Sequence, residues 1–218
     1  MFMTENDSFG AFMFLRFLAV VLCLTGPAMA ECLTQEDFID AEVTVGLQAG
    51  DEWRVMRSDD GVQAEYRDRY GEPLRWQLTE HGVYPRFEQQ NLSVDPASGN
   101  QTPFPAASWE METVYDQDPP PPVAGGNFAT TGVASGNFDG VKKTWAFTVA
   151  YSFDPEKTVT LSGCRYRAIG VNGSFHSSSV DWMGRWVYFP DLAVGIQTKG
   201  KDSRTGESWV NGMIALGG

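Results

Sequence analysis

The sequence predicts a mainly β protein, an antiparallel meander that forms a curved sheet, half-barrel or barrel, with one short N-terminal helix. Over residues 144–153 large apolar residues alternate with small ones at period 2, which is typical of a strand with one buried face. Turn-forming glycine, aspartate, asparagine and proline recur at spacings too short for crossover helices, so neighbouring strands are expected to pair antiparallel. After residue 41 no segment repeats its apolar residues at the helical period of about 3.6.

Residues 1–30 have the composition of an export signal peptide. Arg16 supplies the positive charge before an apolar run over 17–25, and a small-x-small pattern that ends at Ala30 predicts cleavage at that point. The run is far shorter than the roughly 20 residues of a membrane span. We therefore expect an exported protein, periplasmic or extracellular, with a bacterial source favoured. Its mature chain would begin at Glu31 and keep no stable membrane anchor.

Two cysteines, Cys32 and Cys164, remain after removal of the signal peptide, which takes Cys23 with it. An even pair of cysteines in an exported chain predicts a disulfide between them. Residues 33–41 offer the short helix, since Thr34 and Asp37 have the spacing of a capping box. The disulfide would then pin this helix to the sheet.

The mature chain, residues 31–218, is expected to form a single β-rich domain, because either half alone would be a small sheet with open edges. Apolar alternation is visible in Leu74, Trp76 and Leu78. Residues 95–107 and 116–140 are rich in proline, glycine, serine and asparagine and predict long loops. Gly163 predicts a bulge and residues 171–173 a turn. The candidate strands cover residues 42–47, 52–57, 62–69, 74–80, 83–88, 109–115, 143–153, 157–171, 173–180, 183–189, 192–199 and 207–215.

The full chain has a net charge of −12, and its acidic residues are concentrated in the first half of the mature chain. Residues 31–120 carry 19 acidic and 6 basic residues, whereas residues 121–218 carry 7 and 9. This balance argues against nucleic acids and anionic membrane surfaces as partners. We interpret the acidic half as a solvated face that favours solubility, with a surface that binds cations or a partner as the alternative.

A short stretch around Cys164 is the nearest approach to a catalytic motif. Residues 161–165, Leu-Ser-Gly-Cys-Arg, resemble the Ser-His-Gly-Cys-x-Arg motif of bacterial cell-wall L,D-transpeptidases, and the resemblance implies a nucleophilic cysteine. The histidine of that motif is absent here, and a thiolate needs a nearby base. The two histidines of the chain, His81 and His176, have no neighbours at the spacing of metal ligands. We therefore assign no catalytic residue, no metal and no cofactor.

Aromatic residues gather in the second half of the chain. Packing in a buried core is the simpler interpretation of this cluster. The functional interpretation is an apolar cavity inside a barrel or half-barrel, because such folds hold ligands in their mouths. The candidate lining residues of this cavity are Trp145, Phe147, Tyr151, Trp186 and Tyr188.

Three functions are compatible with these observations, and we favour the first. It is an exported soluble β-protein without catalytic activity, which binds an apolar small molecule or supports the cell envelope with an envelope protein as partner. The second is an exported hydrolase or cell-wall enzyme whose site carries no recognised motif. The third is a small outer-membrane β-barrel, since the alternation over 143–153 also fits a lipid-facing strand.

Overall fold

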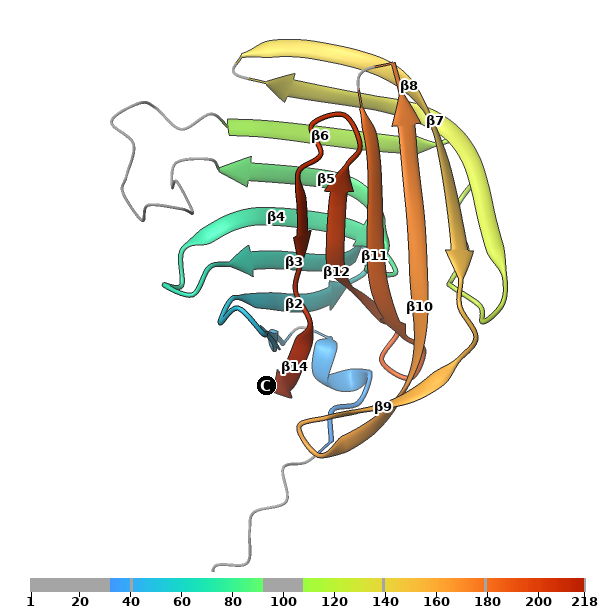
Figure 1. Ribbon diagram of the computed structural model, residues 1–218. Helices are drawn as coiled ribbons and strands as arrows, with labels where there is room; N and C mark the ends of the chain where they lie inside the picture. Colours follow the sequence, from blue (N-terminus) through green and yellow to red (C-terminus); the bar gives the residue numbers. More distant parts are fainter. Residues whose placement is uncertain (1–31, 40, 92–107, 139, 179, 218) are drawn as a thin grey trace, which may run out of the picture. The chain divides into compact units, whose positions relative to one another are not determined.

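A 14-stranded antiparallel sheet carries the fold of the Cys32–Gly218 unit (Figure 1). The computed structural model describes residues 32–39, 41–91, 108–138, 140–178 and 180–217. The prediction of a mainly β, antiparallel, curved sheet is confirmed, and the sheet is unclosed. Its strands are β1 (Val43–Leu47), β2 (Glu52–Ser58), β3 (Gly61–Arg67), β4 (Pro73–Glu80), β5 (Tyr84–Asn91), β6 (Ser108–Tyr115), β7 (Asn127–Phe138), β8 (Val141–Phe153), β9 (Lys157–Leu161), β10 (Cys164–Ser177), β11 (Asp181–Phe189), β12 (Val194–Asp202), β13 (Ser208–Val210) and β14 (Met213–Gly217).

Strands that follow each other in the chain are mostly neighbours in the sheet, which is the meander that the short turns predict. Two strands depart from this rule. β9 pairs with the first residues of β10, Cys164–Ala168, whereas β8 pairs with the later residues, Val171–Ser177. β14 pairs with β1 and not with β13, so β13 and β14 are the two edge strands of the sheet.

The curved sheet folds back on itself, so that its two halves pack together. In Figure 1 β2–β6 run nearly horizontally, and β10–β12 run nearly vertically. Buried side chains of β1–β3, such as Val45 and Trp53, meet buried side chains of β9–β12, such as Tyr166 and Ile196. The halves also touch through their backbones, because a Cβ on Gly82 would overlap the backbone of Gly195. These contacts fix the two halves of the sheet against each other.

The stretch 116–140, which the sequence predicts as a long loop, contains a 12-residue strand, β7, so this prediction is wrong for residues 127–138. β7 pairs with both β6 and β8. Its small residues make room for the large side chains of the neighbouring strand β8, and they do not indicate a loop. Gly132 lies opposite Phe147, and a Cβ on Gly132 would overlap the Phe147 ring. The other predicted loop, 95–107, lies outside the described residues.

Three boundaries in the second half of the chain differ from the predictions. The predicted strand 157–171 is divided by a tight turn at Ser162 and Gly163, which have φ angles of 50° and 82°, and not by a bulge. Residues 171–173 lie inside β10, because pairing with β8 and β11 on both sides holds them extended. The predicted strand 207–215 is divided into β13 and β14 by residues 211–212.

The short N-terminal helix is a single 3-10 turn, η2 (Glu36–Phe38), within the predicted range 33–41. The backbone N–H of Thr34 donates to the Asp37 carboxylate at 2.6 Å, which is one half of a capping box. The turn ends early because Ile39 already forms a β-bridge with Arg57. Phe38 is fully buried in the core, so the turn packs against the sheet through this side chain.

Candidate functional site

A cleft of about 440 Å³ lies between the inner faces of the two halves of the sheet, and we call it the aromatic cleft. Its lining residues come from β4, β5 and β6 on one side and from β8 and β10–β13 on the other. Five of the seven tryptophans of the chain belong to this lining. Clefts of this volume hold small organic ligands. The aromatic lining residues are Trp109, Tyr115, Trp145, Tyr151, Phe175, Trp182, Trp186 and Trp209.

Three glycines on neighbouring strands make space for several of these rings, and we call them the glycine row. Gly184 of β11 is the direct cross-strand partner of both Gly173 in β10 and Gly200 in β12. A Cβ on any of the three would overlap a ring of the cleft, from Tyr151, Trp182, Trp186 or Trp209. The rings therefore lie over bare backbone, and the lining is positioned by the sheet rather than by a loop.

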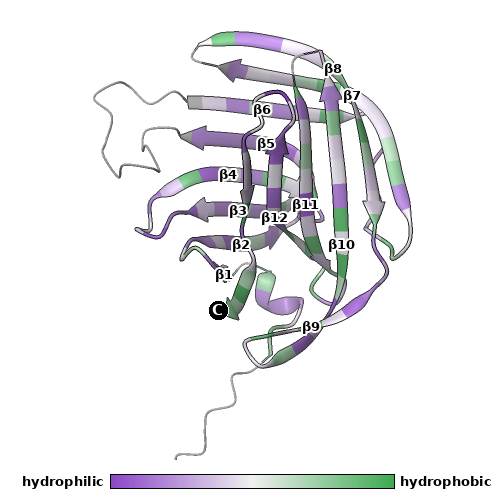
Figure 2. Cartoon of the chain, viewed as in Figure 1, coloured by the Kyte–Doolittle hydropathy of each residue, from purple (hydrophilic) through white to green (hydrophobic). Residues whose placement is uncertain are grey.

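Four polar side chains lie among the lining residues, and we call them the polar cluster: Arg75, Gln77, Glu88 and Gln197. Nη2 of Arg75 lies 2.6 Å from Oε1 of Glu88, and Gln77 donates to the other carboxylate oxygen at 3.2 Å. Arg75 also donates to Oε1 of Gln197 at 3.4 Å, which joins β4 to β12 across the interior. Gln77, Glu88 and Gln197 are each 5% exposed or less. Figure 2 shows β5, which supplies Glu88, mainly in hydrophilic colours.

The polar cluster exists because β4 turns its polar residues inward. The alternation of Leu74, Trp76 and Leu78 indicates a buried apolar face, but these residues are only half-buried. Gln77 and Thr79, between and after them, are 5% and 3% exposed. Trp76 packs instead against Phe87 at a ring-centroid distance of 5.5 Å. A strand that buries its polar face departs from the usual pattern, and such departures are expected at functional sites.

The structure divides the five predicted cavity residues into two groups. Trp145, Tyr151 and Trp186 line the aromatic cleft. Phe147 and Tyr188 do not line it, and both are buried in the adjoining core cluster. Phe147 stacks on the lining residue Phe175 with ring centroids 4.5 Å apart, so it supports the wall from behind. The occupation of this cleft by an apolar ligand stays a prediction.

The tyrosines beside the cleft are held in their neutral form. Burial raises the pKa of the Tyr151 phenol well above its usual value, and the neighbouring Tyr115 hydroxyl acts in the same direction. Burial likewise raises the pKa of Tyr115 and of Tyr84. These phenols add no charge to the wall of the cleft at physiological pH.

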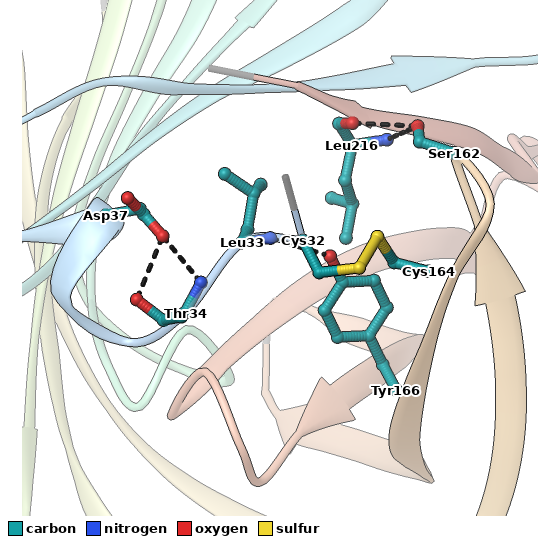
Figure 3. Close-up of a disulfide and its surroundings, with 8 residues drawn as sticks. All are labelled: Cys32, Leu33, Thr34, Asp37, Ser162, Cys164, Tyr166 and Leu216. Atoms are coloured by element: carbon teal, nitrogen blue, oxygen red, sulfur yellow. Dashed lines mark hydrogen bonds between the residues drawn. A yellow bond between two sulfur atoms is a disulfide. The ribbon is translucent and has the colours of Figure 1, made fainter. Parts of the chain in front are cut away.

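Cys32 and Cys164 are joined in a disulfide, with Cα atoms 5.5 Å apart (Figure 3). The backbone N–H of Leu33 donates to the hydroxyl of Tyr166 at 3.1 Å, which adds a second tie at the start of the unit. In the turn before Cys164, the Ser162 hydroxyl donates to the carbonyl of Leu216 at 2.8 Å and accepts from its N–H at 3.0 Å. The first residues of the unit and the last strand are therefore fastened to the same β9–β10 hairpin.

The residues considered for catalysis are not brought together. Cys164 is bonded to Cys32, and His176 lies at the other end of β10 with its Nδ1 3.7 Å from Asp181. His81 lies in the β4–β5 turn, where burial lowers the pKa of its imidazole. Across the described ranges, no group of three or more histidine, cysteine, aspartate or glutamate side chains is placed to hold a metal ion. No helix among the described residues has the length and hydropathy to cross a membrane.

Several residues of the site are missing from the sequence-based prediction. Trp182 and Gly184 stand four and two residues before the predicted Trp186, so their shared face could be recognised from the strand alone. The rest of the glycine row depends on register, which brings Gly173 and Gly200 beside Gly184. The pairing of Arg75 with Glu88 and Gln197 carries no sequence signal, because these residues meet only in the folded sheet.

The chain matches no protein-family model and no curated protein. A solved structure, that of the hypothetical lipoprotein YmcC from Escherichia coli (K12), is similar over 78% of this chain and 80% of that chain. The sequence identity is 10% and the TM-score is 0.41. A likeness this distant identifies neither a ligand nor a role, so the function has to be argued from the cleft itself.

Proposed function

We propose that the protein is an exported binding protein, without catalytic activity, that holds a mainly apolar small molecule in the aromatic cleft. The observation that carries this proposal is the concentration of five tryptophans in the lining of one cleft. Aromatic side chains contribute large contact areas and lose little conformational entropy on binding, which makes them effective binding residues.

The shape of the cleft supports binding over a purely structural role. Protein interiors are packed nearly as densely as organic crystals, with few gaps. Here the glycine row lets the rings lie against the backbone, beside a cleft of about 440 Å³. A cleft that is preorganised in this way binds without first paying for rearrangement of its walls.

Export is the second part of the proposal. It rests on the signal-peptide pattern of residues 1–30 and on the disulfide between Cys32 and Cys164, since disulfides persist in oxidising compartments. The periplasm or the extracellular space meets this requirement.

Binding of a neutral fluorescent naphthalene probe, 1-N-phenylnaphthylamine, tests the cleft. The wild-type protein is expected to enhance the probe's fluorescence saturably. Trp182→Ala should weaken this binding by about threefold to tenfold, the effect expected when one aromatic contact is lost. Trp76→Ala is the matched control, because Trp76 is also a half-buried tryptophan in a strand but does not line the cleft. Its affinity for the probe should equal that of the wild type.

Absence of saturable binding to the wild-type protein would count against the proposed function. Equal losses in Trp182→Ala and Trp76→Ala, with both variants folded by circular dichroism, would place the probe outside the cleft.

Intact mass of the protein recovered from the extracytoplasmic fraction tests export. The mass is expected to correspond to a chain that begins at Glu31, because the small-x-small pattern ends at Ala30. A mass that retains residues 1–30, or one that includes a lipid on Cys32, contradicts this prediction.

A further inference from the structure

The polar cluster has two hydrogen-bond donors that no described residue satisfies. Nε of Arg75 and Nε2 of Gln197 are both buried and have no hydrogen-bond partner in the part of the chain that the structure describes. Both residues line the aromatic cleft, and Gln197 is 3% exposed. Buried polar groups in native proteins are nearly always paired, so two unpaired donors beside a cleft indicate a partner that enters it.

The orientation of the Gln197 amide is determined by its neighbour. Its Oε1 accepts the hydrogen bond from Arg75 at 3.4 Å. With the amide reversed, Nε2 would face the guanidinium and two donors would oppose each other. The group of Gln197 that is left unpaired at the wall of the cleft is therefore an N–H donor, and the matching ligand atom is an acceptor.

The charges of the lining decide which acceptor fits. Arg75 is already neutralised by Glu88, since the two side chains lie 2.6 Å apart and Glu88 is 4% exposed. The other charged lining residues are Lys201, Asp202 and Glu207, so the lining as a whole carries more negative than positive charge. An anionic group beside the polar cluster would lie next to the Glu88 carboxylate, with Arg75 already paired, which is unfavourable.

We propose that the cleft recognises a neutral amphipathic molecule, with a ring-containing apolar body against the tryptophans and a carbonyl, ester or amide oxygen against Arg75 and Gln197. This inference rests on the proposed function and specifies the class of its ligand. The glycine row places the rings along one wall and the polar cluster presents its donors beside them. The two features together select for an acceptor at the end of an apolar body.

Three probes with the same naphthalene body test the selection: 2-acetylnaphthalene with a neutral acceptor, 2-isopropylnaphthalene without one, and 2-naphthoate with an anionic one. Each is used to displace 1-N-phenylnaphthylamine from the full mature chain at neutral pH. The acetyl compound is expected to bind about threefold to tenfold more tightly than the isopropyl compound, the contribution of a satisfied hydrogen bond. Naphthoate is expected to bind the most weakly.

The variant Gln197→Glu keeps the size of the side chain and replaces the donor Nε2 by an acceptor. It should abolish the preference for the acetyl over the isopropyl compound, measured as the ratio of the two affinities within the same variant. Equal affinities of the wild-type protein for these two compounds, or tightest binding of naphthoate, would overturn the inference and leave the apolar cleft in place. Displacement by none of the three would overturn the proposed function as well.

Discussion

Replacing Phe147 with alanine is expected to lower the free energy of unfolding by about 3–5 kcal/mol, the usual loss for a buried phenylalanine. Phe147 is 2% exposed, and its ring packs against Phe175 and Tyr115 at centroid distances of 4.5 and 5.6 Å. The ring also lies over Gly132, which has no side chain to move into the space that the substitution leaves. Equilibrium unfolding in denaturant measures the loss.

Val133→Ala is the control for this prediction. Val133 follows Gly132 in β7, but it is 44% exposed on the outer face of the same strand pair. Its truncation is expected to change the free energy of unfolding by less than about 1 kcal/mol. A loss of similar size in Phe147→Ala would show that the inner face of β8 is not part of the core.

Removal of the disulfide is expected to have the other large effect. Cys32 and Cys164 are separated by 132 residues, and a loop of this length corresponds to a stabilisation of up to about 5 kcal/mol in the chain-entropy description. The double variant Cys32→Ser with Cys164→Ser should therefore melt at a clearly lower temperature. Its far-ultraviolet circular dichroism should keep the β spectrum of the wild type, because the strands of the sheet are joined by their own backbone hydrogen bonds.

Thiol titration checks the premise of this experiment. The unfolded, unreduced mature protein is expected to show no reactive thiol, and two should appear after reduction. Two free thiols before reduction would contradict the bridge. They would also return Cys164 to the set of possible nucleophiles, together with the resemblance of residues 161–165 to the transpeptidase motif.

The fold class can be predicted from the sequence because period-2 alternation and short turns are both local signals, each of which depends on residues close together in the chain. β8 illustrates this, since its inner residues Phe147, Val149 and Tyr151 are all buried. β7 is not predicted from the sequence, because its signal is not local. The value of Gly132 and Ala134 in a strand depends on the bulky residues of β8 that lie against them, and composition alone makes such a segment resemble a loop.

The aromatic cleft could be predicted only in part. Trp145, Tyr151 and Trp186 follow from counting aromatic residues on predicted strands. The polar cluster could not be found in this way, because alternation in β4 favours the face of Leu74 and Trp76 as the buried one. That preference is reversed by partners remote in sequence, such as Gln197, which is 122 residues from Arg75.

The pairing of β1 with β14 has a consequence for the order in which a newly made chain can fold. Val45 of β1 lies opposite Leu216 of β14, so the first strand of the sheet pairs with the strand that is made last among these fourteen. Contacts this distant in sequence form slowly, and an unpaired strand edge is prone to join other chains. The edge of β1 therefore stays unpaired until β14 has been made, and until then it is expected to be prone to join other chains.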